Sequence, residues 1–209
     1  MTPMRALLVA CLVVLAGCAP RRVDPVASRL TGRFPDVVLT DQDGQRVRFY
    51  SDLVRGHVVL VNFMYTTCTR KCPRVSSNLV AVQDALGPRL GQDVLMLSVS
   101  LDPARDTPPA LAGYAAVLGA KPGWRFLTGT EDDVQLVRRR LGVTDPDPVI
   151  DADRTQHAGI VVYGNDATGR WSAVPGLMRP QLIADAVLRV ADPLAPRAAP
   201  TLGPPCPAR

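Results

Sequence analysis

Residues 57–65 (HVVLVNFMY) form a nearly continuous run of apolar and β-branched side chains, and this run constrains the fold more than any other feature. A strand with that pattern is typically buried on both faces, so it needs strands beside it and helices above and below it. Two cysteines, Cys68 and Cys72, follow directly. Residues 72–86 then repeat apolar side chains at spacings of four, three and four, which predicts an amphipathic helix. The sequence thus predicts a buried strand that leads through a cysteine pair into a helix.

The remaining elements predict a layered α/β domain. Strands at residues 37–40 and 47–50 flank a turn at 41–44, which predicts a first hairpin. A second buried strand, two helices, a second hairpin and a last helix are expected at residues 94–101, 108–118, 131–141, 159–174 and 179–190. This order predicts a thioredoxin-like α/β sandwich, in which helices flank a central mixed sheet and the N-terminal hairpin is an addition.

The composition excludes several functional classes. The 209 residues are 47% hydrophobic and 21% charged, which is normal for a globular protein and excludes wholesale disorder. The net charge is +5, yet the arginine run at residues 138–140 lies in a predicted helix close to acidic residues at 131–133. That run is expected to be a solvated helix face rather than a phosphate-binding surface. We therefore expect no nucleic-acid partner.

The N-terminus predicts an export signal. Arg5 precedes an apolar segment, residues 6–16, that is too short to span a bilayer stably but fits a signal peptide. The segment ends in Leu-Ala-Gly-Cys, which resembles a bacterial lipobox, and the lipidated cysteine would be Cys18. We expect a lipoprotein signal peptide at residues 1–17 and a membrane tether at 18–33, with a plain secretory signal as the alternative. The expected location is the bacterial cell envelope, lipid-anchored and facing the periplasm.

The C-terminal residues 192–209 differ in composition from the rest of the chain. They contain six prolines and show no helical or strand periodicity, which predicts a Pro-rich disordered tail after a domain at residues 34–191. Three roles stay open for Cys206 in this tail: an incidental thiol, a resolving thiol, or a link to another chain.

The spacing of Cys68 and Cys72 predicts shared chemistry. Residues four apart at a helix start lie on one side of the turn, which permits a disulfide or two-point coordination of one metal ion. The helix N-terminus, together with Arg70 and Lys71, is expected to lower the pKa of the thiols. Thiolates are soft ligands that favour Cu(I), and Zn(II) is the alternative.

A third ligand would be a neutral nitrogen, and the chain has 2 histidines. His57 begins the first buried strand, at the end far from the cysteines, so we expect it to be structural. His157 lies just before the second hairpin, where sheet loops can face the cysteines, although a single histidine is more often structural. Asp102 and Asp106 follow the second buried strand, where they either accept hydrogen bonds near the site, form a docking edge, or shape the turn.

Several motifs together carry a family resemblance. They are the run from Asn62 to Cys68 (NFMYTTC) that leads into Cys72-Pro73, then Ser100-Leu101-Asp102-Pro103, Asp106-Thr107-Pro108, and His157. In these motifs the chain resembles the SCO/SenC family, copper-binding proteins involved in assembly of cytochrome c oxidase. The resemblance implies a thioredoxin-like domain that binds one copper ion per chain through Cys68, Cys72 and His157.

Three functions follow from these residues. The first is a metallochaperone that delivers copper to a cuproprotein target such as an oxidase subunit, and it needs a thiol reductant as a second partner. The alternative is a thiol–disulfide oxidoreductase, in which Cys68 attacks the target and Cys72 resolves the mixed disulfide. Copper delivery requires His157, whereas disulfide exchange does not. The third is an inert Cys68–Cys72 disulfide in a lipid-anchored interaction domain, although so short a loop would stabilise the fold little.

Overall fold

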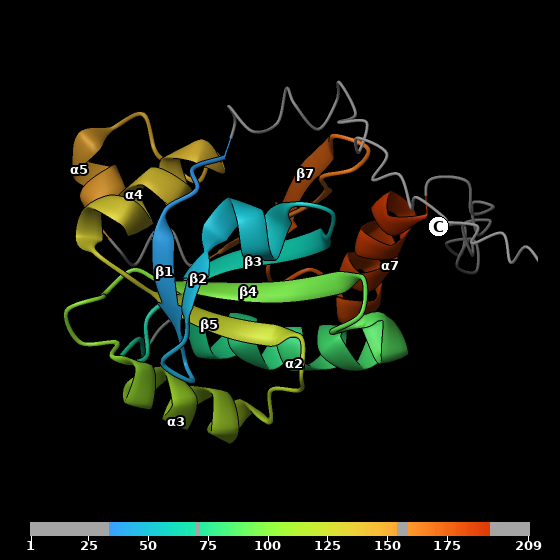
Figure 1. Ribbon diagram of the computed structural model, residues 1–209, viewed down its shortest axis with the longest axis horizontal. Coiled ribbons are helices and arrows are strands. Elements are labelled where there is room, and N and C mark those ends of the chain that lie inside the picture. The colour runs from blue at the N-terminus through green and yellow to red at the C-terminus, as the bar shows by residue number, and fades with distance from the viewer. Residues whose placement is uncertain (1–33, 70–71, 154–158, 193–209) are drawn as a thin grey trace, which may run out of the picture.

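Strand β3 (Val58–Met64) lies near the middle of a seven-stranded mixed sheet with the order β2-β1-β5-β4-β3-β6-β7. The protein is described by a computed structural model at residues 34–69, 72–153 and 159–192 (Figure 1). Strand β4 (Val94–Ser100) pairs with β3 in parallel, and β5 (Trp124–Thr128) pairs with β4 in parallel. All seven residues of β3 are buried, as its sequence predicts.

Antiparallel strands complete the sheet at both edges. The N-terminal hairpin, β1 (Val38–Asp41) and β2 (Arg46–Arg48), joins the sheet through β5. On the other side, β6 (Ile160–Asn165) pairs with β3, and β7 (Arg170–Pro175) pairs with β6 as the edge strand. The predicted mixed sheet with an added N-terminal hairpin is therefore confirmed.

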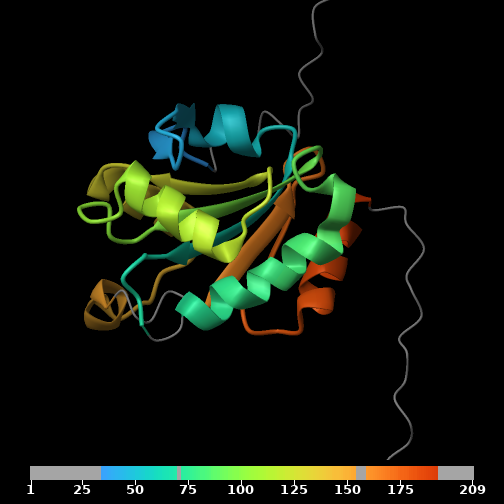
Figure 2. The ribbon, with the colours of Figure 1, turned by 90° about the horizontal axis from the view of Figure 1, so that it is seen from below.

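Helices cover both faces of the sheet. One face carries α2 (Cys72–Leu86), α3 (Pro108–Leu118) and α7 (Pro180–Ala191), and α2 and α7 lie side by side (Figure 2). The other face carries the π-helical turn η1 (Phe49–Val54) and α4 (Glu131–Arg140). A 3-10 turn, η2 (Gly87–Arg89), follows α2, and the short α5 (Pro148–Ala152) precedes β6.

Each face of the sheet has its own apolar core because side chains alternate along a strand. In β3, Leu60 and Met64 pack toward α2, whereas Val61 and Phe63 pack toward η1 and α4. Burial of this kind contributes about 25 cal/mol per Å² of apolar surface. Because β3 contributes side chains to both cores, both cores depend on it.

One local prediction was wrong, and one strand was not predicted. The second strand of the first hairpin was expected to reach residue 50, but it ends at Arg48, and η1 begins at Phe49. The Asp52 carboxylate accepts a hydrogen bond from the Arg48 N–H at 2.7 Å, so the chain turns away from the ladder. Strand β5 was not predicted, because it is only five residues long and Arg125 interrupts its apolar pattern.

The flanking segments stay predictions. The expected signal peptide at residues 1–17, the tether at 18–33 and the tail from residue 193 onward lie outside the described residues. Among the helices that the structure does describe, none combines the length and the apolar character needed to cross a bilayer.

Candidate functional site

The two cysteines lie where β3 ends and α2 begins. Cys68 follows β3 by four residues, and Cys72 is the first residue of α2. Both are free thiols, and they are 7% and 1% exposed. The Cys72 N–H donates a hydrogen bond to the Cys68 sulfur at 3.4 Å. The helix start therefore holds both sulfur-bearing residues together, as their spacing predicts.

Burial, rather than the helix dipole, determines the pKa of the Cys72 thiol. Removal from water, followed by a hydrogen bond with Cys68, raises the pKa of Cys72 to about 12. The expectation of a lowered pKa was wrong for Cys72, because Cys72 packs inside the apolar core between α2 and the sheet. Arg70 and Lys71, which were expected to contribute, lie outside the described residues. Cys72 is therefore protonated at neutral pH unless a metal ion or a disulfide replaces the proton.

Tyr65 is a half-buried neighbour of the cysteine pair. Burial, then a hydrogen bond with Cys68 and the nearby thiols, raises the pKa of its hydroxyl to about 12. The charge of Asp153 contributes to this rise in pKa, so that carboxylate lies near the site as well. The tyrosine hydroxyl is thus a neutral hydrogen-bonding group beside Cys68.

Asp106 fixes the loop that carries Cys68. The loop is a turn closed by the Cys68 N–H, which donates to the Tyr65 carbonyl at 3.2 Å. Within this turn, the Thr66 hydroxyl and N–H both donate to the fully buried Asp106 carboxylate, at 2.5 and 3.2 Å. The Ser100 hydroxyl at the end of β4 donates to the same carboxylate at 2.6 Å. The structure therefore places Asp106 directly behind the cysteine loop.

Asp102 shapes its own loop. Its N–H donates to the Ser100 hydroxyl at 2.9 Å, and its carboxylate pairs with the Arg105 guanidinium at 3.0 Å. Its carbonyl accepts the N–H groups of Arg105 and Asp106. These contacts fit the turn-forming role that the sequence left open, and through Ser100 they link Asp102 to the Asp106 carboxylate behind the cysteine loop.

The two histidines fall at different places. His57 precedes β3, whose seven residues extend over about 20 Å, so it lies at the opposite end of the strand from the cysteines. His157 lies outside the described residues. The chain on either side of it is described: Asp153 acts on Tyr65, and Val161 of β6 pairs with Asn62 of β3. Both flanking positions are thus at the cysteine end of the sheet.

Arg138 was missed by the sequence analysis. Instead of belonging to a solvated face, its side chain is 4% exposed and forms a bidentate pair with Asp151 of α5, with both contacts at 2.6 Å. It also donates to the Val143 carbonyl at 3.0 Å. A signal was present, because Arg138 is four residues after the buried Val134 and so shares its helix face. The pair anchors α5 just before residues 154–158.

The comparisons with known proteins agree with this architecture. The SCO1/SenC family model matches residues 26–192. The chain belongs to the SCO1/SenC family. That match includes both cysteines, both loop aspartates and His157.

Individual relatives of this SCO1/SenC protein are distant. An SCO2-like protein of Rickettsia prowazekii is 31% identical over 105 residues, which are 50% of this chain and 49% of that relative. The chain thus spans about half the length of that curated relative. The structure of Bradyrhizobium japonicum ScoI with copper bound is 26% identical and covers 73% of this chain and 96% of that chain, with a TM-score of 0.57.

A further neighbour supports the fold alone. A SCO1/SenC family lipoprotein from Bacillus anthracis is 22% identical, covers 76% of this chain and 95% of that chain, and has a TM-score of 0.62. Together, the strand order and these neighbours confirm the thioredoxin-like α/β class that the sequence predicts.

Proposed function

We propose that this SCO1/SenC protein binds one copper ion per chain through Cys68, Cys72 and His157 and delivers it to a cuproprotein, such as a subunit of cytochrome c oxidase. The observation that carries the proposal is the pair of buried free thiols, joined by the Cys72 N–H to Cys68 sulfur contact of 3.4 Å. Copper as the metal is supported by the related copper-bound ScoI. His157 is supported by the family resemblance and by the described positions on both sides of it.

The site chemistry suits a metal that must later leave. Two thiolates are soft ligands that favour Cu(I), and the apolar core around Cys72 excludes water. Because the pKa of Cys72 is raised to about 12, copper binding at neutral pH must release its proton. During delivery, a target ligand replaces one protein ligand at a time, and each departing thiolate takes up a proton. The oxidation state of copper does not change, and a thiol reductant keeps both cysteines reduced.

Anaerobic copper titration tests this function. The fully reduced protein is mixed with one equivalent of Cu(I) in the presence of a competing chelator. We expect tight one-to-one binding in the wild type, its loss in Cys68→Ser and Cys72→Ser, and weaker binding in His157→Ala. His57→Ala is the matched control, because its imidazole lies at the far end of β3. Unchanged copper affinity in either cysteine variant would remove the ligand assignment.

The oxidoreductase is a second candidate, and the unequal burial of the two sulfurs favours it. Both residues are buried, but Cys68 is 7% exposed and Cys72 only 1%, which fits an attacking thiol and a resolving thiol. In that reaction Cys68 breaks a target disulfide, and Cys72 then displaces the target to leave a Cys68–Cys72 disulfide and two target thiols. Disulfide exchange that persists in His157→Ala, combined with weak copper binding in the wild type, would favour this function.

We infer that the protein is a lipoprotein of the bacterial cell envelope, with the domain at residues 34–191 facing the periplasm and tethered through Cys18. The support is the Leu-Ala-Gly-Cys segment that ends at Cys18. Several acyl chains hold a protein at a membrane far more firmly than one chain does. Cys18→Ala should therefore move the protein from the membrane fraction to the soluble fraction. Membrane retention of that variant would contradict the lipid anchor.

A further inference from the structure

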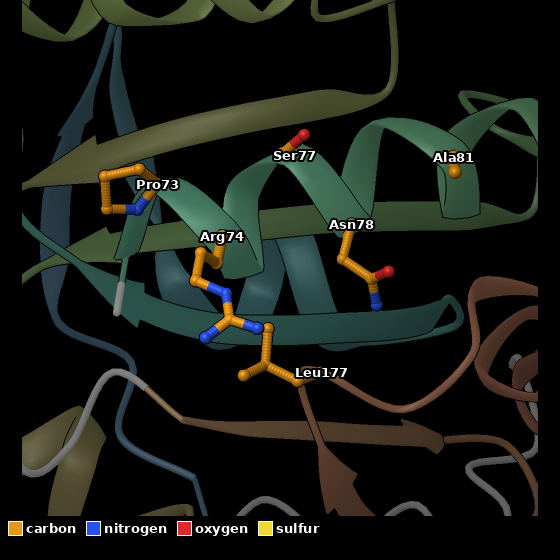
Figure 3. Close-up of a pocket in the computed structure, with 6 residues that line it drawn as sticks. All are labelled: Pro73, Arg74, Ser77, Asn78, Ala81 and Leu177. Atoms are coloured by element: carbon orange, nitrogen blue, oxygen red, sulfur yellow. The ribbon is translucent and has the colours of Figure 1, made fainter. Parts of the chain in front are cut away.

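A groove of about 530 Å³ lies along the start of α2, and its lining begins at Pro73, the residue after Cys72. Its floor is the solvent-facing side of α2 from Pro73 to Ala81, and its wall is the loop between β7 and α7, which contributes Leu177 (Figure 3). Pro73 follows Cys72 in the chain, so the groove leads away from the candidate site. The eight residue steps from Pro73 to Ala81 correspond to about 12 Å of helix, the length of about four extended residues of another chain.

The groove is preformed. The side-chain amide of Asn78 on α2 donates to the carbonyls of Gly176 and Met178, at 2.9 and 2.7 Å. The Gly176 N–H donates to the Gly159 carbonyl at 2.7 Å. A Cβ at Gly176 would lie 2.9 Å from a methyl group of Val75, so this position requires glycine for the loop to approach α2. A fixed wall reduces the ordering cost of binding a partner.

Small side chains form the floor, and an exposed apolar side chain forms the wall. Ser77 and Ala81 are exposed and four residues apart on α2, so together they leave a shallow channel. Leu177 is 49% exposed and is one of the few large hydrophobic side chains left open to solvent in the described part of the chain. The groove therefore offers one apolar contact beside a polar floor.

The charge around the groove is positive. Arg74 lines it, and in Figure 3 its side chain extends from α2 toward Leu177. None of the described residues that line the groove is acidic, and Arg74 forms no ion pair with any of the described residues. The first turns of α2 and α7 contain no acidic residue, whereas that of α4 contains three. Arg179 lies at the start of α7, two residues after Leu177. This surface complements a negatively charged partner.

We propose that this groove is the docking site for an extended segment of the partner protein that carries a carboxylate and an apolar side chain next to the group exchanged with Cys68. The inference rests on the proposed function for the statement that a partner protein exchanges copper or thiols here. The carboxylate pairs with Arg74, and the apolar side chain packs on Leu177. Docking along α2 places the partner's reacting group at the N-terminal end of the helix, beside the cysteines.

Peptide disulfides test the docking without copper. Each probe is a five-residue peptide whose single cysteine is joined to 5-thio-2-nitrobenzoate, and its other residues include one leucine with either two glutamates or two lysines. The Cys68 thiolate attacks the peptide sulfur and releases thionitrobenzoate, which absorbs light. Cys72 then attacks Cys68, so the protein becomes a disulfide and the peptide leaves as a thiol. Hydroxyethyl disulfide, which is small and neutral, reports the intrinsic reactivity of the pair.

Variants of the full chain identify the surface. We expect the wild type to react about five- to tenfold faster with the glutamate peptide at low salt, and the preference should decrease as salt is added. Arg74→Glu should reverse the preference. Leu177→Ser should slow both peptides and leave hydroxyethyl disulfide unchanged. Arg46→Glu is the matched charge control, because Arg46 is an exposed arginine on β2 at the opposite edge of the sheet.

Equal rates of the wild type with both peptides would overturn the proposal, as would equal effects of Arg74→Glu and Arg46→Glu. A second copy of the chain is the competing occupant. If Arg74→Glu alters the way the sedimentation coefficient depends on protein concentration but leaves the peptide preference unchanged, the groove is an interface between two copies of the chain and the proposal fails. Because no metal takes part in the peptide reaction, a loss of peptide preference with intact Cu(I) binding would refute the docking groove and support the copper site. Absent Cu(I) binding with an intact peptide preference would refute the copper site and support the docking groove.

Discussion

Replacing Asp106 by asparagine should weaken both the fold and the cysteine pair. The Asp106 carboxylate is fully buried and accepts hydrogen bonds from the Thr66 hydroxyl, the Thr66 N–H and the Ser100 hydroxyl. An asparagine keeps one acceptor oxygen, but it loses the negative charge, and its amino group can no longer accept a hydrogen bond from Ser100 or Thr66. Hydrogen bonds to a charged group are worth about 1.5–3 kcal/mol, so the variant should lose about 2–4 kcal/mol of unfolding free energy in urea titrations.

The effect on the site should pass through Thr66. Because Thr66 is part of the turn that Cys68 closes, a loosened Thr66 allows Cys68 to move away from the Cys72 N–H. Losing a group that orients a metal ligand typically lowers metal affinity by about 10–100-fold. We expect Asp106→Asn to lower Cu(I) affinity within that range. In a double-mutant cycle with Thr66→Val, the two losses of stability should be less than additive, with a coupling energy of about 1 kcal/mol or more.

Asp41 supplies the matched control. It is also buried, and its carboxylate accepts hydrogen bonds from the N–H groups of Asp43 and Gln45 and from Arg125, in the N-terminal hairpin. Asp41→Asn should therefore lower stability and leave Cu(I) affinity unchanged. If Asp106→Asn lowers stability but leaves Cu(I) affinity at the wild-type value, the positioning argument is refuted. If its stability is unchanged, the hydrogen-bond argument is refuted.

Three further predictions concern other groups. At pH 8 a thiol with the Cys72 pKa of about 12 is about one ten-thousandth thiolate; iodoacetamide should thus label Cys68 first, and equal labelling by mass spectrometry would contradict the burial argument. Arg138→Leu removes the guanidinium that pairs with the partly buried Asp151 carboxylate and should lower the unfolding free energy by about 2–4 kcal/mol, whereas the exposed Arg139→Leu should change it by less than about 0.5 kcal/mol. Burial raises the pKa of Asp166 above 3.8, so its charged form destabilises the fold above the folded-state pKa, and this cost disappears as pH falls below the unfolded-state value. Asp166→Asn should therefore raise stability in urea more at pH 7 than at pH 3; an equal gain at both would exclude this titration.

Periodicity alone predicts the elements that lie next to the site. The predicted helices at residues 72–86 and 108–118 have the same bounds as α2 and α3. Both have clear local signals, since α2 carries an apolar stripe and α3 begins with two prolines. Strand β5 has a weak local signal and is held by β4 and β1 on its two sides. Its existence depends on pairing between distant segments, which a short window of sequence does not contain.

The sequence predicted that Cys68 and Cys72 lie together, but it did not predict the pKa of Cys72. The cysteine spacing at a helix start gives the Cys72 N–H to Cys68 contact, which is local geometry. The raised pKa of Cys72 depends on how deeply the helix start is buried, and that depth is set by packing against Leu111 of α3 and other residues far along the chain. A motif can thus place a thiol at a helix N-terminus without showing whether burial outweighs the dipole.

Arg138 shows where a sequence signal exists and where it ends. Its spacing of four residues from Val134 puts it on the buried face of α4, so its burial was predictable. Its partner was not predictable, because Asp151 belongs to α5, a helix of five residues with no apolar repeat. Predicting a long-range ion pair of this kind requires knowing which distant segments of the chain pack together.

Asp106 and Arg138 perform related tasks, because each is a buried polar side chain that holds a segment leading to a residue of the site. Loops at a strand end expose polar backbone, so nondirectional apolar packing cannot fix them as it fixes β3. Asp106 holds the loop that leads to Cys68, and Arg138 holds α5, one residue before Asp153, whose charge acts on Tyr65. Substitutions in the core on the η1 and α4 face of the sheet should therefore lower stability without changing the cysteines, whereas substitutions of Asp106 or Arg138 should change both.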